Sequence, residues 1–307
     1  MNEPDFLNAL RPLATHPAAR GLMDDAAVLG DLIFTHDMLV EGVHFLATDP
    51  ASDVAWKLLA VNLSDLAAKG AMPVGVLMGY TLSGDSDWDA GFVGGLAVAL
   101  DFFNVSLLGG DTVATSGPRL LSLTAIGRSM FAPTRTGAQP GDALYVTGVI
   151  GLAGLGLNIA RKHGSPERPT NTLRANECGY LDAYRRPMPR LTEGQALAPI
   201  VHAMMDVSDG LLIDAQRMAA ASGLALAIDL DAVPCAGERI AAMTAGDDYE
   251  LLFAASPDIS LPVPATRIGT FSGGEGISLF DRNGPVQLPE KLGYTHGQVA
   301  TTAETTL

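Results

Sequence analysis

Short acidic clusters flanked by glycine, serine or threonine recur along this sequence, and carboxylates in such settings can bind metal ions and phosphates. They are Asp24-Asp25, Asp37, Asn62-Leu63-Ser64-Asp65, Gly109-Gly110-Asp111-Thr112, Asp206-Val207-Ser208-Asp209-Gly210 and Gly246-Asp247-Asp248-Tyr249-Glu250. Mg²⁺ is a hard cation that takes oxygen ligands, usually one or two carboxylates together with phosphate oxygens and water. Glycine beside an aspartate lets backbone N–H groups approach a phosphate closely. The clusters therefore predict a site for a polyphosphate and several Mg²⁺ ions.

The rigid elements that must position these carboxylates follow from the hydrophobic pattern. Residues 52–69 are expected to form a helix with Ser52 as its N-cap. Within this helix Asn62, Asp65 and Lys69 are spaced i, i+3 and i+7, which places them on one face. Asp65 is therefore expected to be held in a fixed direction by the helix.

Alternating strand-like and helix-like segments predict an α/β protein of two domains, since 307 residues are about twice the roughly 150 residues typical of one domain. The stretch 132–141 is rich in proline and glycine and is expected to divide the chain into domains 1–138 and 139–307. The expected strands are 31–35, 74–82, 105–108, 120–126, 143–147, 224–230, 251–255 and 266–271. The other expected helices are 88–103, 152–161, 191–204 and 211–221. Acidic and basic residues directly follow several of these strands, which is where open α/β sheets commonly bind ligands.

Composition excludes several classes of function. The formal net charge of −15 argues against an extended nucleic-acid surface, which needs a basic stripe. No apolar run reaches the roughly 18 residues of a membrane span, and the acidic start of the chain shows no secretory signal, so a cytoplasmic protein is expected. Cys178 and Cys235 show no CxxC spacing and are expected to be free thiols. The chain has no Gly-Lys dipeptide, so a Walker A loop is absent and any ATP must be held by other means.

Each acidic motif also has a simpler interpretation when it is taken alone. Ser208 or Asp209 could cap the helix that follows them, and Asp65 could be a solvated side chain. His44 could be a packing histidine, and the motif that ends in Asp111 could be a plain turn. The order in which all the motifs occur together favours the functional interpretation.

In that order the motifs resemble those of the thiamine-monophosphate kinase family. They include Asp24-Asp25-Ala26-Ala27-Val28, Asp37-Met38-Leu39-Val40-Glu41-Gly42-Val43-His44-Phe45, Asn62-Leu63-Ser64-Asp65-Leu66-Ala67-Ala68, Leu108-Gly109-Gly110-Asp111-Thr112 and the two clusters at 206–210 and 246–250. The match runs from about residue 20 to about residue 295. The resemblance implies an aminoimidazole ribonucleotide synthetase-like fold, with an N-terminal domain that forms a homodimer through its sheet and a C-terminal α/β domain. It also implies ATP-dependent, Mg²⁺-assisted phosphorylation of thiamine monophosphate to thiamine diphosphate by direct in-line transfer, without a covalent phospho-enzyme.

The resemblance assigns the site residues position by position. Metal ligation is implied for Asp25, Thr35, His36, Asp37, Asp65, Asp111, Asp206 and Asp209. Contact with ATP is implied for Gly110, Asp111, Arg128 and Ser208, with Arg128 and Asp111 stabilising transition-state charge. Contact with thiamine monophosphate is implied for His44, Asp247 and Tyr294. The chemistry is consistent, because an imidazole can donate to a phosphate and a carboxylate can pair with a thiazolium or accept from an aminopyrimidine.

Two alternatives remain open from the residues. One is another ATP-using enzyme of the same superfamily, although no cysteine precedes Cys178, where a selenophosphate synthetase would carry its reactive residue, and the chain ends in Ala303-Glu304-Thr305-Thr306-Leu307 without the cysteine-bearing tail of a hydrogenase-maturation protein. The other is a nonenzymatic regulator that binds Mg²⁺ and nucleotide and turns nothing over.

Overall fold

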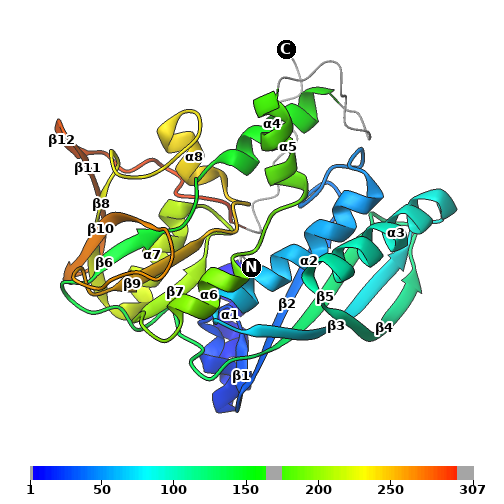
Figure 1. The fold of residues 1–307 in the computed structure, drawn as a ribbon, viewed down its shortest axis with the longest axis horizontal. Helices are drawn as coiled ribbons and strands as arrows, with labels where there is room; N and C mark the ends of the chain where they lie inside the picture. Colours follow the sequence, from blue (N-terminus) through cyan, green and yellow to red (C-terminus); the bar gives the residue numbers. More distant parts are fainter. Residues whose placement is uncertain (1–2, 164–174, 296–307) are drawn as a thin grey trace.

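The structure consists of two α/β units that lie side by side (Figure 1). It is a computed structural model in which residues 3–163 and 175–295 are described. The strands of the first unit all precede residue 129, and those of the second follow residue 142. The predicted class, a two-domain mixed α/β fold, is therefore confirmed. Within the described ranges no helix is long and apolar enough to span a membrane.

The first unit is built on a five-stranded sheet of order β1-β2-β5-β3-β4. Its strands are β1 (Ala27–Leu29), β2 (Leu32–Val40), β3 (Met72–Leu82), β4 (Ser106–Ala114) and β5 (Leu120–Arg128). Only the β3–β4 pair is parallel. The chain reaches β1 through α1 (Glu3–Leu10) and the short helices η1 (Arg11–Leu13) and η2 (Pro17–Leu22).

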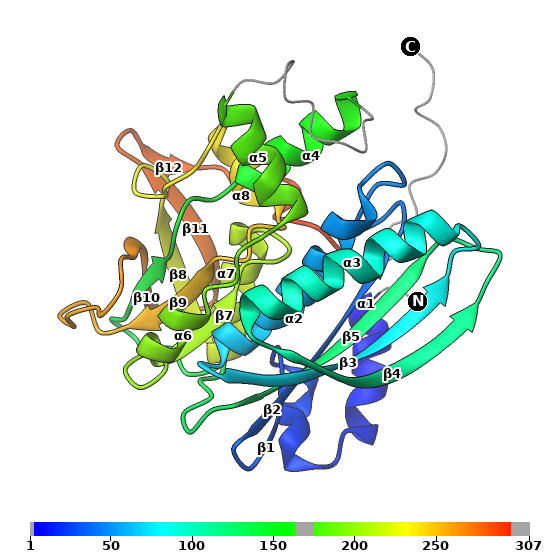
Figure 2. The same cartoon turned by 45° about the vertical axis from the view of Figure 1, so that its right-hand side comes forward.

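The helices α2 (Ala51–Ala68) and α3 (Ser86–Phe103) cover one face of this sheet (Figure 2). Alternation along β5 places Leu121, Leu123 and Ala125 in the core beneath these helices. Ser122 and Thr124 therefore point to the opposite face, which we call the open face. Residues in register with them on neighbouring strands share that face.

The second unit is built on a seven-stranded sheet of order β12-β11-β8-β10-β6-β9-β7. Its strands are β6 (Ala143–Val146), β7 (Ala203–Asp206), β8 (Leu224–Asp229), β9 (Leu251–Ala255), β10 (Thr266–Gly273), β11 (Gly276–Asp281) and β12 (Gly284–Val286). Its helices are α4 (Leu152–His163), α5 (Ala175–Arg185), α6 (Leu191–Leu197), α7 (Leu211–Ser222) and α8 (Arg239–Ala245). Cys178 and Cys235 are free thiols, as expected.

Several expected boundaries were wrong. The strand expected over 31–35 continues to Val40, so His36 and Asp37 lie within β2. The helix predicted over 191–204 ends at Leu197, because Pro199 has no N–H group to continue the hydrogen bonds of the helix, and residues 203–206 form β7 instead. Helix α2 begins at Ala51 after Pro50, without a side-chain cap from Ser52. The strand expected to end at Leu108 continues through the glycine pair to Ala114, with a register shift against β3.

Helix α2 joins the two units. It is buried along most of its length, and its last residues, Ala67 and Ala68, pack in one core with Leu197, Met204 and Phe253 of the second unit. Polar contacts with the second unit hold the N-terminal part of the helix in place.

Those polar contacts come from the segment that follows α5. The Trp56 indole N–H donates to the Pro187 carbonyl at 3.0 Å, and Arg186 Nε donates to Asp53 at 2.5 Å. The two units are thus held together at both ends of α2.

The crossing of α6 over α2 depends on Gly194. A Cβ at this position would lie 2.0 Å from the Ala67 carbonyl oxygen, so a larger residue must push the two helices apart. We expect Gly194→Ala to lower the free energy of unfolding by about 1–3 kcal/mol, measured by chemical denaturation. Gly179→Ala in α5 is the matched control, because a Cβ there meets nothing within 4 Å and alanine favours a helix. Equal effects of the two substitutions would contradict this account of the crossing.

Candidate active site

Three carboxylates from separate segments meet between the two units. Asp25 lies before β1, Asp65 lies on α2, and Asp206 ends β7, and one ligand oxygen from each lies within 4.8 Å of the others. The donors are all carboxylate oxygens, which suits a hard divalent cation such as Mg²⁺. The residues present therefore fit the metal that the sequence predicts.

Side chains of α2 place the rest of the cluster. The Asn62 side-chain carbonyl accepts the Asp37 N–H at 3.0 Å, and the Thr35 hydroxyl donates to the Asn62 main-chain carbonyl at 3.2 Å. The Ser64 hydroxyl donates to Asp206 at 2.6 Å. One helix thus connects β2 of the first unit with β7 of the second. Burial, followed by the charges of nearby carboxylates, raises the pKa of Asp37 to about 6.

Buried cations balance part of this negative charge. Lys69 is fully buried, and its Nζ lies 2.6 Å from one oxygen of Asp24 and 2.6 Å from one of Asp25. Arg135 pairs with Asp25, and Arg20 pairs with Asp24. The predicted face of α2 that carries Asn62, Asp65 and Lys69 does reach the site, but the counter-ion role of Lys69 was not foreseen. The available signal was a lysine four residues after Asp65, at the C-terminal end of the helix.

The pKa values of the cluster separate according to the cations that each carboxyl group meets. Burial alone would raise the pKa of Asp25, but Lys69 and Arg135 outweigh it and hold this pKa well below its usual value. Burial and the charge of Asp25 raise the pKa of Asp206 to about 8. Burial and the neighbouring carboxylates also raise the pKa of Asp65. In the absence of a divalent cation the cluster therefore retains protons at neutral pH, and metal binding would displace them.

The loop 206–210 is held in place by a buried carboxylate of α7. One oxygen of Asp214 accepts the N–H groups of Ser208 and Asp209 at 3.1 Å each, and Arg217 bridges Asp209 and Asp214. The N-cap of α7 is Gly210, so neither Ser208 nor Asp209 caps the helix. The Ser208 side chain is at an exposed position, from which its hydroxyl can reach a ligand.

The predicted substrate residues gather around the same loop. The Asp247 N–H donates to the Ser208 carbonyl at 2.7 Å, and the Tyr294 N–H donates to the Asp209 carbonyl at 2.8 Å. Lys57 connects Asp247 to the loop of His44, because its Nζ pairs with the Asp247 carboxylate and donates to the His44 carbonyl at 3.2 Å. The sequence analysis did not predict a role for Lys57, because nothing in its position within the helix indicates a functional contact.

Four other predicted residues do not join this cluster within one chain. His36 lies on the open face, where its ring contacts Thr124 at 2.8 Å. Gly110 and Asp111 lie on β4, separated from Asp37 on β2 by two strands, or about 14 Å. Register with Gly79 places the Asp111 side chain on the open face.

Arg128 ends β5 on that open face and pairs with Asp31. Both of its partners in register, Leu32 and Met72, begin strands at the same end of the sheet. The predicted site is therefore divided between the open face and the space between the two units.

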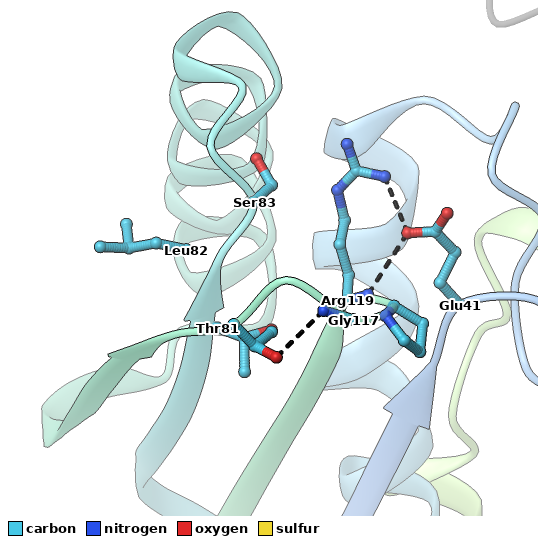
Figure 3. Close-up of a pocket in the computed structure, with 8 residues that line it drawn as sticks. Glu41, Thr81, Leu82, Ser83, Gly117 and Arg119 are labelled. Atoms are coloured by element: carbon cyan, nitrogen blue, oxygen red, sulfur yellow. Dashed lines mark hydrogen bonds and ion pairs between the residues drawn. The ribbon is translucent and has the colours of Figure 1, made fainter.

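A pocket of about 310 Å³ lies at one end of the first sheet, near the loop of His44 (Figure 3). Arg119 donates to Glu41 at 2.8 Å, and its guanidinium lies 4.3 Å from the centre of the Trp88 ring. The Thr81 hydroxyl donates to the Leu120 carbonyl and accepts from the Leu120 N–H, at 2.8 Å each. These contacts join the ends of β2, β3 and β5, so they support the loop that begins at Glu41.

Comparison with protein families identifies the class to which the fold belongs. The N-terminal domain of AIR synthase related protein matches residues 23–129, and the C-terminal domain of the same family matches residues 139–281. The fold and the carboxylate cluster therefore define a two-domain protein of the AIR synthase-related class. Within that class, the chain belongs to the thiamine-monophosphate kinase family.

Individual relatives support this assignment. The thiamine-monophosphate kinase of Caulobacter vibrioides is 39% identical, with 94% of this chain and 88% of the relative covered. That of Escherichia coli K12 is 36% identical over 90% of this chain and 91% of the relative. A solved structure described as AaThiL complexed with AMPPCP and TMP is 26% identical, covers 96% of this chain and 97% of its own, and gives a TM-score of 0.85. The thiamine-monophosphate kinase structure from Stenotrophomonas maltophilia K279a is 38% identical over 90% and 94% of the two chains, with a TM-score of 0.73.

The balance of buried charge around Lys69 can be tested directly. Lys69→Met would leave Asp24 and Asp25 buried without their shared counter-charge, so we expect a loss of about 3–5 kcal/mol in the free energy of unfolding. Lys291→Met, at an exposed position, is the control and should unfold like the wild type. Adding Asp24→Asn to Lys69→Met should restore part of the loss. No restoration, or a Lys69→Met variant as stable as the control, would contradict the counter-ion role.

Proposed function

We propose that this protein phosphorylates thiamine monophosphate to thiamine diphosphate with ATP. The observation that carries the proposal is the cluster of Asp25, Asp65 and Asp206 between the two units, in a chain of the thiamine-monophosphate kinase family. A solved relative described as complexed with AMPPCP and TMP covers nearly the whole chain. The cluster supplies the oxygen ligands that an ATP-dependent phosphoryl transfer needs.

The reaction joins two anions, so the work of the protein is to position them and to offset their charge. A phosphate oxygen of thiamine monophosphate attacks the γ-phosphorus of ATP, and the bond from that phosphorus to the β-phosphate oxygen breaks as ADP leaves. The cluster would hold Mg²⁺, which would supply positive charge to offset the negative charge of the phosphates. The ligands that we propose are the three clustered carboxylates together with Thr35, Asp37 and Asp209.

The remaining residues have roles of orientation in this proposal. The Ser208 hydroxyl contacts ATP from the loop that precedes α7. His44, Asp247 and Tyr294 surround the thiamine phosphate, since all three are tied to that loop or to Lys57. No residue is required as a covalent nucleophile.

The assay that tests this function follows the products. We expect purified protein with Mg²⁺, ATP and thiamine monophosphate to form thiamine diphosphate and ADP, resolved by chromatography. Asp65→Asn removes a ligand from the centre of the cluster and should lower kcat by at least about 100-fold. Asp258→Asn, at an exposed position far along the chain from the cluster, is the matched control and should keep full activity. ADP formed only with other acceptors, or nucleotide binding without any product, would overturn the proposal.

We further propose that the active unit is a homodimer formed through the open face of the first sheet. This face presents a band of apolar side chains that are between 37% and 58% exposed, namely Met38, Met72, Leu77, Leu108, Val113 and Leu120. Exposed apolar patches on one face of a protein commonly mark sites of interaction with another protein. Asp111 lies within this band, next to Val113, and β4 is exposed along its whole length.

A face-to-face dimer offers an account of the divided site. In such a pair the open face of one copy faces the other copy, so Asp111, Gly110, Arg128 and His36 lie nearer the partner than their own cluster. We therefore propose that one copy supplies Asp111 and Arg128 to the phosphates held by the cluster of its partner. Any metal contact of His36 then also belongs to this shared site.

Complementation tests the shared site without knowledge of its geometry. Asp111→Asn and Asp65→Asn should each be inactive alone. After the two are unfolded together and refolded, half of the dimers would carry one intact site of two, so about a quarter of wild-type activity should return. Two copies of Asp111→Asn refolded together serve as the control for refolding. No recovery in the mixture, with dimers formed, would show that Asp111 does not act across the interface.

A further inference from the structure

Lys57 is a buried lysine whose contacts lie away from the carboxylate cluster. It is 2% exposed and stands eight residues before Asp65, roughly 12 Å along the axis of α2. Its counter-charge is Asp247, and its Nζ lies 4.2 Å from the centre of the Tyr184 ring. A buried lysine is costly unless it is paired, so this arrangement depends on the Asp247 side chain being in place.

Asp247 is held from several directions. Its backbone lies in the left-handed region, with φ of 67°, and its N–H is fixed to the Ser208 carbonyl at 2.7 Å. One carboxylate oxygen accepts from the Tyr249 hydroxyl at 2.8 Å, and the other pairs with Lys57. The side chain is still 28% exposed, so it can meet a ligand while it is held. Its direction is therefore fixed before any ligand arrives.

Lys57 also positions the loop that carries His44. The Lys57 ammonium donates to the His44 carbonyl at 3.2 Å, while the His44 ring accepts the Val40 N–H at Nδ1 at 3.0 Å. Because Nδ1 accepts, a neutral ring carries its proton on Nε2. One ammonium group thus joins two of the three residues proposed to contact the substrate, His44 and Asp247, which come from different units of the fold.

The pairing changes what Asp247 can recognise. A lone carboxylate would attract the positively charged thiazolium of thiamine, but a carboxylate that shares its charge with a buried ammonium 3% exposed has little net charge to offer. It keeps oxygen lone pairs, so it remains a good hydrogen-bond acceptor. The amino group of the aminopyrimidine ring is a donor of the matching kind.

Resting on the proposed function, we infer that Lys57 is a positioning residue that neutralises Asp247 and aims it as an acceptor for the amino group of the aminopyrimidine. Lys57 acts on substrate recognition through Asp247, and it does not touch the phosphates. Its loss should therefore weaken binding of thiamine monophosphate and leave binding of ATP unchanged.

Steady-state kinetics with two acceptors tests the inference. The wild type should prefer thiamine monophosphate over oxythiamine monophosphate, in which an oxo group replaces the amino group, by at least about tenfold in kcat/KM. Lys57→Met should raise KM for thiamine monophosphate about tenfold and shrink that preference, with KM for ATP unchanged. Lys57→Arg keeps the charge and should recover most of the affinity. Lys162→Met, at an exposed position on α4, is the control for loss of a lysine.

A double-mutant cycle separates positioning from a general structural role. If Lys57 acts through Asp247, then Lys57→Met should add little to the effect of Asp247→Asn on KM for thiamine monophosphate. Additive effects, or a parallel rise in KM for ATP, would overturn the inference. A lower KM in Lys57→Met would also overturn it, because it would mean that Asp247 pairs with the thiazolium and that Lys57 opposes this pairing. Failure of the wild type to form thiamine diphosphate would instead refute the proposed function itself.

Discussion

The burial of mutually repelling carboxylates between two domains is the constraint on which this structure depends. Asp25, Asp65 and Asp206 bring ligand oxygens within 4.8 Å of one another, and like charges at that distance cannot all be ionised without compensation. The compensating groups come from α2 and from the segment between the two sheets, as Lys69 and Arg135. Docking of the domains therefore changes the balance of charge, since it brings Asp206 of the second unit beside Asp25 and Asp65, whose cluster is compensated through the pairing of Asp25 with Lys69 and Arg135.

Helix α2 is buried and largely apolar, and it carries the polar side chains that contact the carboxylates of both units. Ser64, Asp65 and Lys69 serve the carboxylate cluster, and Lys57 serves Asp247 roughly two turns before Asp65. Ser64 pairs with Asp206 and Lys57 with Asp247, both of the second unit, so Ser64 and Lys57 would be unpaired if the units separated. A rotation of α2 by one residue would misplace all of them together. The distance between the metal ligands and the substrate residues is thereby fixed by helix geometry.

The sequence allowed the prediction of those parts that depend on local pattern. The motifs and the helix carrying Asp65 could be recognised, and Pro199 already marked where the helix begun at Leu191 must end, although that signal was overlooked. The counter-ions could not be predicted, because the pairing of Arg135 with Asp25 joins residues more than one hundred positions apart. The same holds for Lys57, whose partner Asp247 lies on the other domain. Long-range charge compensation leaves no periodic trace in a sequence.

In the first sheet, the alternation of side chains along each strand decides which face of the sheet each residue occupies. Thr35 and Asp37 point toward α2, and His36 between them necessarily points to the open face. The three consecutive residues Thr35, His36 and Asp37, which the family resemblance assigns together to metal binding, therefore lie on two different faces of the sheet. For His36 and Asp111 to act on the same phosphates as Asp37, the open face must be brought opposite a second cluster. The proposed homodimer would meet this condition, and the exposed apolar band around Asp111 is the surface through which it would form.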